Sequence, residues 1–208
     1  RPPLGTVPAL DGVSLSVPSG GSVASVGPSG CGKSTLLGLL GGLELPTSGE
    51  VQIGDTLVSA LPDQRRAGFR RRSIGFVFQA DNLQPFLTVT ENVGLQSVLA
   101  GLPDDAARTQ ELLNALDVGD LGQRFPDQLS GGQRQRVAVA RALVHRPRMV
   151  LADEPTGNLD TASSGKVVDL LLRVQQARGM SLVVVTHDRM VAERMDVIVE
   201  LRAGRVHA

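Results

Sequence analysis

Apolar positions along this chain form short runs and longer stretches with helical spacing, and Gly and Pro residues separate them. Short apolar runs bounded by turn residues are typical of strands, whereas apolar residues three and four positions apart are typical of helices. The predicted strands are Val13–Val17, Ser22–Val26, Glu50–Ile53, Ile74–Phe78, Arg148–Ala152, Ser181–Thr186 and Asp196–Leu201. The predicted helices are Ser34–Leu40, Asp104–Leu116, Gln133–Val144, Thr161–Arg178 and Arg189–Glu193.

The order of these elements predicts the fold class. Strands and helices alternate in the first and last thirds of the chain, which is typical of a largely parallel α/β sheet. The middle, from about Thr88 to Pro126, has helical periodicity without a strand pattern, so we expect an inserted helical lobe. With 208 residues, the chain fits one domain, with or without a small appended lobe.

Composition narrows the class of protein. The chain is 41% hydrophobic and 20% charged, which is enough apolar material for a packed core. Lys plus Arg and Asp plus Glu each number 21, and this balance argues against a dedicated nucleic-acid-binding protein. One cysteine excludes a disulfide framework and a multi-cysteine zinc site. No apolar run reaches the roughly 20 residues of a bilayer span, and the N-terminus lacks a signal-peptide core, so we expect a soluble intracellular domain.

A glycine-rich phosphate-binding motif lies between a predicted strand and a predicted helix. The residues Gly27-Pro28-Ser29-Gly30-Cys31-Gly32-Lys33-Ser34 fit the pattern G-x-x-x-x-G-K-[ST]. Glycines let backbone N–H groups surround phosphates, and the N-terminus of the helix adds partial positive charge. Lys33 would reach the β- and γ-phosphates, and the Ser34 hydroxyl would ligate Mg²⁺. A plain glycine-rich turn with a solvated lysine is the alternative.

Two further segments carry candidate chemistry. The apolar strand Arg148–Ala152 leads into Asp153 and Glu154, where Asp153 would hold Mg²⁺ through water and Glu154 would polarise an attacking water. In isolation such a pair is as often a plain strand edge. The second segment, Leu129–Gln133, has Ser130 as a helix N-cap followed by two glycines with unobstructed amides, which predicts a second anion site. A simple capped helix is the alternative there.

Taken together, these segments resemble the nucleotide-binding subunit of ABC transporters over essentially the whole chain. The segments similar to the Walker A, Q-loop, signature, Walker B, D-loop and switch-histidine motifs are, in chain order, Gly27–Thr35, Gln79, Leu129–Gln133, Met149–Glu154, Asn158–Asp160 and His187. The resemblance implies an α/β P-loop NTPase fold of the ABC ATPase type over residues 1–208. It implies a mostly parallel core sheet, an antiparallel β subdomain and a helical subdomain, about 88–145, inserted in the RecA-like core.

The resemblance also assigns roles to individual residues, with ATP and Mg²⁺ as cofactors. The implied catalytic residues are Glu154, His187 and Gln79, and the implied metal ligands are Ser34, Gln79 and Asp153. The implied nucleotide-binding residues are Gly27, Pro28, Ser29, Gly30, Cys31, Gly32, Lys33, Ser34, Thr35, Ser130, Gly131, Gly132, Gln133 and Asp160. By resemblance, two copies pair head to tail, so that each ATP lies between one phosphate loop and the partner's signature.

Each implied role has a plainer alternative. Gln79 would ligate Mg²⁺ and sense the γ-phosphate, but a glutamine after a strand is usually only a polar loop residue. His187 would contact the γ-phosphate, but a lone histidine at a strand end is more often structural. Asp160 can cap the helix from Thr161 while also touching the opposite site. Cys31 is interpreted as a packing residue.

One feature departs from the family pattern, in which an aromatic residue upstream of the phosphate loop stacks on adenine. The chain has no Trp or Tyr, and its first Phe is Phe69. The platform is therefore either an aromatic residue before Arg1 or a poorer surface formed by Pro2, Leu4 or Val7.

The segments Gly42–Gly49 and Asp153–Asp160 resemble the branch that serves lipoprotein release, macrolide and peptide export, and cell-division control. We therefore expect a peripheral subunit on the cytoplasmic side of the cell membrane, docking an integral membrane permease near Gln79–Leu95 through exposed apolar residues such as Leu83 and Phe86. A cell-division regulator without a transported substrate is the alternative. A soluble DNA-repair or translation ATPase would need long insertions that this chain lacks. Nucleic acid is not an expected partner, and the arginine run 65–72 is interpreted as a solvated helix face.

Overall fold

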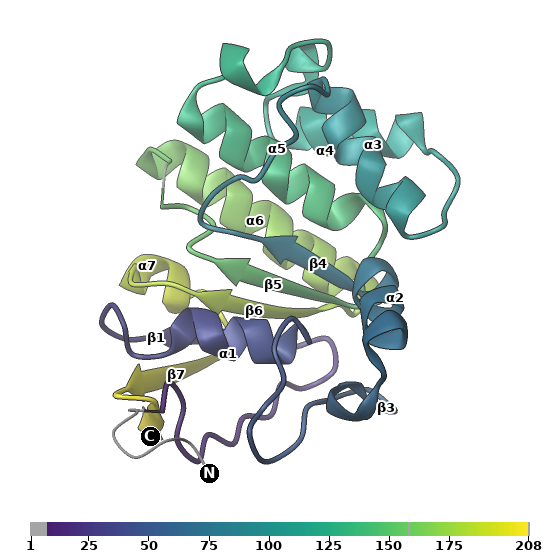
Figure 1. Cartoon of the computed structure of the whole chain (residues 1–208). Coiled ribbons are helices and arrows are strands. Elements are labelled where there is room, and N and C mark those ends of the chain that lie inside the picture. Colours follow the sequence, from purple (N-terminus) through teal and green to yellow (C-terminus); the bar gives the residue numbers. More distant parts are fainter. Residues whose placement is uncertain (1–7, 158, 208) are drawn as a thin grey trace.

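The computed structural model describes residues 8–157 and 159–207, and within them a central sheet lies between two layers of helices (Figure 1). The sheet order is β4-β5-β6-β1-β7-β8, in which β8 is antiparallel to β7 and the other pairs are parallel. The strands are β1 Ser22–Val26, β4 Ile74–Val77, β5 Met149–Asp153, β6 Ser181–Val185, β7 Val197–Arg202 and β8 Arg205–His207. A separate antiparallel pair consists of β2 Gln52–Ile53 and β3 Thr56–Leu57.

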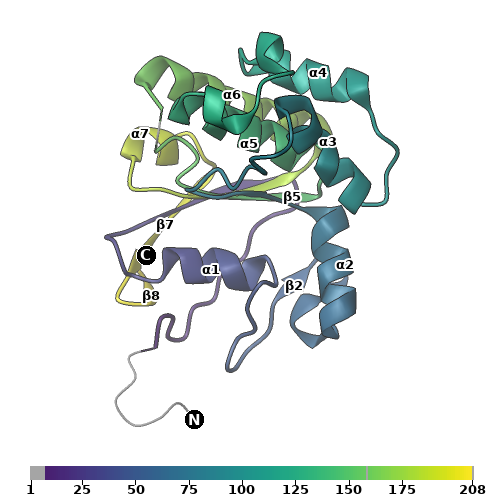
Figure 2. The same ribbon diagram turned by 45° about the horizontal axis from the view of Figure 1, so that its top comes forward.

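The helices divide between the two faces of the sheet, with α1 and α2 on one side and α5 and α6 on the other (Figure 2). The α-helices are α1 Lys33–Leu40, α2 Asp63–Ser73, α3 Val89–Leu99, α4 Ala106–Ala115, α5 Gly131–Val144, α6 Thr161–Arg178 and α7 Arg189–Ala192. No helix in the described ranges is both long enough and apolar enough to cross a bilayer.

Both faces of the central strands are buried, which explains why these strands read as continuous apolar runs. Along β6, Leu182 and Val184 pack into the core beneath α5 and α6, whereas Val183 and Val185 pack into the core on the α1 side. All four side chains are at most 1% exposed. Full burial of each such side chain contributes about 1.5–3 kcal/mol, so the sheet is a rigid base for the loops at its carboxyl edge.

The inserted lobe consists of α3, α4 and the outer part of α5, as the helical periodicity predicts. Its first helix begins at a capping box in which Thr88 accepts from the Glu91 amide and the Glu91 carboxylate accepts from the Thr88 amide. Leu112, Leu113 and Leu116 lie in the same core cluster as the apolar residues of α5. Because α5 contacts both α3 and β4, it joins the lobe to the sheet.

Three local predictions are wrong. Val13–Val17 alternates half-buried and exposed residues but forms no strand, because alternation reports one-sided burial whereas a strand also needs a hydrogen-bonded neighbour, and none is assigned in the described residues. The arginine run is not wholly solvated, since Arg66 is buried and Arg70 donates to the Gly42 carbonyl at 2.6 Å. Leu83 is buried and not exposed.

Candidate nucleotide-binding and hydrolysis site

The loop between β1 and α1 has a backbone that only glycine fits at key positions. Gly32, the N-cap of α1, has a φ of 104°, and a β-carbon there would overlap the Ala9 carbonyl oxygen. A β-carbon on Gly27 would overlap the Leu201 carbonyl oxygen. Gly32 has no side chain to cap α1, so the first-turn N–H groups of this helix are available to an anion.

Lys33 lies over this loop at the first position of α1. Its Nζ donates to the carbonyl oxygens of Gly27 at 2.8 Å and of Pro28 at 2.9 Å. Cys31, within this loop, is buried, and its Sγ lies 3.9 Å from Lys33 Nζ, which agrees with the packing interpretation of this residue. The ammonium group is therefore held at the place where a phosphate would approach the loop.

Two of the three residues predicted as Mg²⁺ ligands, Ser34 and Asp153, are in contact. Ser34 Oγ donates to Asp153 Oδ2 at 2.8 Å, joining the first turn of α1 to the end of β5. Magnesium in nucleotide sites is bound by one or two protein oxygens together with phosphate oxygens and water. A hydroxyl and a carboxylate beside a phosphate loop fit that requirement.

Glu154 and His187 form a second pair at the ends of adjacent strands. Glu154 Oε1 accepts from the His187 backbone N–H at 3.0 Å and lies 2.7 Å from His187 Nδ1, and Glu154 Oε2 accepts from Thr186 Oγ1 at 3.2 Å. The side chain of Glu154 is 12% exposed, and that of His187 is 75% exposed. Glu154 also has a φ of 48°, a left-handed conformation that is unfavourable for this residue type and typical of functional sites. Three groups therefore hold a nearly buried carboxylate beside an exposed imidazole.

A cavity of about 320 Å³ opens beside this pair and extends to the start of α6. Leu159 and Thr161 line it together with Glu154 and His187. Asp160 caps α6 by accepting from the Ser163 N–H at 3.0 Å and from Ser163 Oγ at 2.7 Å, and these bonds lower the pKa of the carboxyl. The predicted capping role is confirmed. Asn158 of the predicted D-loop, and Pro2, Leu4 and Val7 of the predicted adenine platform, lie outside the described residues.

The predicted signature forms the N-terminus of α5. Ser130 Oγ accepts from the Gln133 N–H at 3.2 Å, and Gln133 Oε1 accepts from the Ser130 N–H at 2.8 Å, which makes a complete capping box. Each of these two side chains therefore accepts from the backbone N–H of the other residue, and the first-turn amides of Gly131 and Gly132 are left for an anion. Since α1 and α5 cover opposite faces of the sheet, a single chain places the two predicted anion sites in different layers (Figure 2).

Gln79 lies two residues beyond β4 and is exposed. Sequence reasoning missed the contacts that hold the next turn of the chain, where Asp81 and Asn82 bind Arg134 and Arg141 of α5. A signal was present, because these arginines are seven positions apart and so share one face of the helix that follows the signature.

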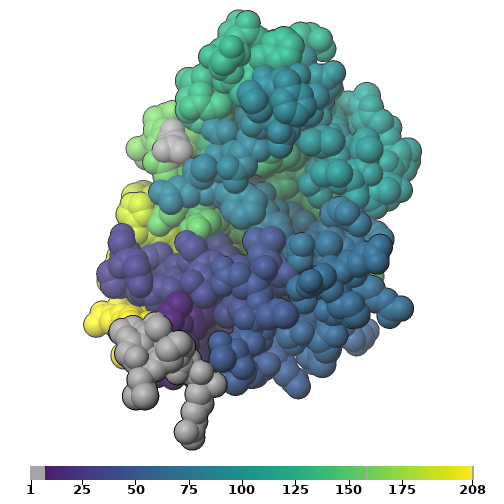
Figure 3. Space-filling view, in the orientation of Figure 1, coloured from purple at the N-terminus to yellow at the C-terminus, as the bar shows by residue number. Residues whose placement is uncertain are grey.

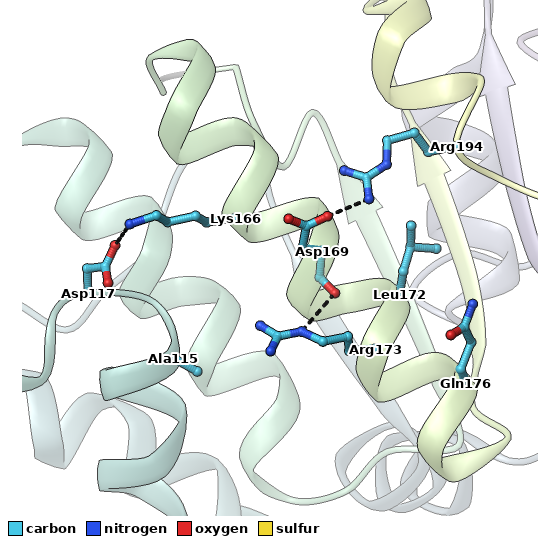
Figure 4. Close-up of a pocket in the computed structure, with 8 residues that line it drawn as sticks. All are labelled: Ala115, Asp117, Lys166, Asp169, Leu172, Arg173, Gln176 and Arg194. Carbon is cyan, nitrogen blue, oxygen red and sulfur yellow. Dashed lines mark hydrogen bonds and ion pairs between the residues drawn. The ribbon is translucent and has the colours of Figure 1, made fainter.

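A larger cavity of about 600 Å³ lies outside this site, between α4, α6 and the segment after α7 (Figure 4). Lys166 pairs there with Asp117, and Arg194 Nη2 pairs with Asp169 Oδ1 at 2.5 Å. No residue predicted for nucleotide binding lines this cavity. We therefore assign the candidate site to the carboxyl edge of β1, β5 and β6.

Comparisons with known proteins agree with this geometry. Residues 10–157 match the family described as "ABC transporter". The "Lipoprotein-releasing system ATP-binding protein LolD" of Xanthomonas campestris pv. campestris (strain 8004) is 50% identical over 201 residues, which are 96% of this chain and 84% of the relative. LolD of Legionella pneumophila (strain Lens) is 47% identical over 206 residues, 98% of this chain and 90% of the relative. A solved structure, "Dimeric structure of a post-hydrolysis state of the ATP-binding cassette MJ0796 bound to ADP and Pi", has a TM-score of 0.92 and 41% identity, and the match covers 96% of this chain and 89% of that one.

Proposed function

The chain belongs to the ABC transporter family as an ATP-hydrolysing subunit, and from that premise we propose that two copies bind ATP between them and drive a membrane partner of the lipoprotein-release type. The observation that carries the proposal is the pair of contacts at one sheet edge, Ser34 with Asp153 and Glu154 with His187. One contact supplies donors for a phosphate-bound cation, and the other supplies a held carboxylate that can accept a proton.

The residues of the site divide the chemistry between them. The amides of the Gly27–Gly32 loop and the N-terminus of α1 bind the phosphates, and Lys33 places a positive charge on them. Ser34 and Asp153 would hold Mg²⁺, which when bound neutralises charge on the β- and γ-phosphates. Glu154 orients the attacking water and accepts its proton. His187, in contact with Glu154 Oε1, keeps that oxygen in place and is exposed enough to reach the γ-phosphate.

The second anion site supports assembly of two copies. A single chain holds the Gly131–Gly132 amides on the opposite side of the sheet from α1, so they can serve a phosphate only on another chain. The solved relative described above is, by its own description, dimeric with ADP and Pi bound. In the proposed dimer each ATP therefore lies between the phosphate loop of one copy and the α5 N-terminus of the other, as the family resemblance implies.

The segment between Gln79 and Leu95 is proposed to dock the membrane partner. It lies at the surface between the α1 part of the molecule and the helical lobe (Figure 3). Phe86 is 72% exposed, and Val98 and Leu99, at the end of α3, are 61% and 49% exposed. Within the proposed segment, Phe86 is a candidate anchor, because a large exposed aromatic side chain is typical of an interaction surface and an apolar partner helix would cover it. In this proposal the subunit lies peripherally on the cytoplasmic side of the membrane, bound to that partner.

The named relatives favour lipoprotein release over the cell-division alternative, because both are lipoprotein-releasing proteins by name. ATPase assays with mixed chains test the shared site that the proposal requires. In the proposed dimer, Ser130→Arg damages the site at which the partner's phosphate loop binds ATP. Lys33→Ala damages the site at which the chain's own phosphate loop binds ATP. Each variant alone should be inactive, and mixing them should restore activity because one composite site in each mixed dimer is intact. Absence of rescue, with hydrolysis strictly proportional to protein concentration, would show that each chain works alone.

A further inference from the structure

The turn that follows β4 is fastened to α5 by charged side chains. Arg134 Nε donates to Asp81 Oδ2 at 2.8 Å. Arg141 donates twice, from Nη1 to the Asn82 carbonyl oxygen and from Nη2 to the Asp81 carbonyl oxygen, both at 2.7 Å. Figure 1 shows this segment passing along α5 on its way from β4 to α3. The two sides of this contact are more than 50 residues apart in sequence, so the fold brings them together.

These contacts are of a strong kind. The side chains of Arg134 and Asp81 are 35% and 27% exposed, so water screens their charges less than on an open surface. Arg141 is deep enough that burial lowers the pKa of its guanidinium, and it presents its planar fork to two carbonyl oxygens of one turn. Because a charged donor binds neutral oxygens more strongly than an amide does, the turn has little freedom to move away from α5.

The flanks of the turn are fastened to the same lobe. Before it, Gln135 of α5 is fully buried and donates from Nε2 to the Phe78 carbonyl oxygen at 3.3 Å. After it, Asn92 of α3 accepts from the Gln84 N–H at 2.7 Å and donates to the Gln84 carbonyl oxygen at 3.1 Å. The segment from Phe78 to Gln84 is therefore bound to the helical lobe along its length.

Arg134 also reaches the signature turn. Its Nη1 donates to the Leu129 carbonyl oxygen at 2.8 Å, one residue before the Ser130 cap. One guanidinium thus bridges the turn after Gln79 and the turn before α5. A displacement of either turn would break charged hydrogen bonds to the other, so the two turns move as one unit.

We propose that Asp81, Arg134 and Arg141 are positioning residues that couple the two ATP sites of a dimer. The inference rests on the proposed composite site, in which the signature turn of a chain contacts the partner's ATP while Gln79 of the same chain faces its own ATP. The Asp81–Arg134–Arg141 clamp makes the position of Gln79 depend on whether the partner's nucleotide has engaged the signature turn. Hydrolysis at the two sites is therefore cooperative, and the clamp carries the cooperativity.

The test measures ATPase rate against ATP concentration in Arg134→Gln, Asp81→Asn and the charge-swapped double variant Asp81→Arg/Arg134→Asp. The wild type should show a Hill coefficient above 1, and each single variant should bring it to about 1 with a several-fold lower kcat. The double variant restores the charge pair but leaves the Leu129 carbonyl oxygen without its donor, so its Hill coefficient should also stay at about 1. Asp117→Asn, which breaks the ion pair with Lys166 in the 600 Å³ cavity, is the matched control and should leave both quantities unchanged.

A structural role alone would lower Tm and kcat without changing the Hill coefficient, so that result overturns the proposal. A wild-type Hill coefficient of about 1, or single variants that keep the wild-type coefficient, overturns it as well. The mixing experiment with Ser130→Arg and Lys33→Ala chains tests the composite site independently of the clamp. If mixing restores activity while the clamp variants keep full cooperativity, the composite site stands and the clamp proposal fails. If mixing restores nothing, the composite site itself fails.

Discussion

Replacing Glu154 by Gln removes a proton acceptor while leaving the shape of the site almost unchanged. In the native site Oε1 meets the His187 N–H and Nδ1, and Oε2 meets the Thr186 hydroxyl. A glutamine can keep its carbonyl oxygen on the His187 side, and Thr186 can turn its hydroxyl to accept from the new amide. The variant should therefore fold and bind Mg-ATP like the wild type.

Loss of a general base typically costs a factor of about 10² to 10⁴ in rate. The lower limit corresponds to about 2.7 kcal/mol of transition-state stabilisation, at 1.36 kcal/mol for each factor of ten. We therefore expect kcat for ATP hydrolysis to fall at least about a hundredfold in Glu154→Gln. Phosphate release would measure kcat, and titration calorimetry would measure ATP affinity.

A matched pair at Thr186 separates loss of the base from loss of its support. Thr186→Val deletes the hydroxyl that donates to Glu154 Oε2, and Thr186→Ser keeps it. A hydrogen bond to a charged group contributes about 1.5–3 kcal/mol, so the valine variant should be slowed by about tenfold or more while the serine variant stays near wild type. Turnover of Glu154→Gln within about threefold of wild type, at unchanged ATP affinity, would refute the role of Glu154 as base.

Two other outcomes are expected. Lys33→Ala should weaken ATP binding by about tenfold or more, because it removes the charged donor aimed at the phosphates. The control is Lys166→Ala, because the Lys166 amine pairs with Asp117 in the 600 Å³ cavity. If calorimetry gave the two variants equal ATP affinities, the proposed site would be contradicted. Burial lowers the pKa of His145, whose Nε2 lies 3.2 Å from the Ile74 carbonyl oxygen, so the unfolded chain binds the proton more readily than the folded one. The stability that this neutral histidine contributes is complete above its ordinary pKa of about 6.5 and is lost as the pH falls below it. Between about pH 7.5 and 5.5, Tm should therefore drop more in the wild type than in His145→Gln. Parallel plots of Tm against pH for the two proteins would exclude His145 as the cause.

The sequence predicted most of the site because its motifs are local. The phosphate loop needs only a strand, glycines and a helix start in succession, and Ser130 and Gln133 of the capping box are three residues apart. Family resemblance assigned Glu154 and His187 to the same site, and the parallel pairing of β5 with β6 explains their contact, because the carboxyl ends of such strands share one edge of the sheet. Family resemblance then supplied the order of motifs that periodicity alone does not provide.

The parts that were missed depend on contacts between distant segments. Val13–Val17 has the alternation of a strand, yet whether it becomes one depends on a partner strand that its own residues do not specify. Leu83 looked like an exposed docking residue, but it packs into the main core cluster. The bonds of Asp81 with Arg134 and of Asn82 with Arg141 join residues 53 and 59 positions apart. Charge and spacing identify such arginines as one helix face, but only the fold shows which turn they hold.

The local contacts also bear on how two copies would assemble. Ser34 already contacts Asp153, His187 already contacts Glu154, and Ser130 with Gln133 already fixes the start of α5, all within a single chain. Binding costs most where side chains and loops must be ordered, and these groups are ordered beforehand. In the proposed dimer, ATP therefore has to bring together two rigid anion sites and has little local structure to build. The phosphate charge of ATP lies between two helix N-termini that would otherwise repel each other, so it favours association of the copies. The copies would separate once that charge has left the site.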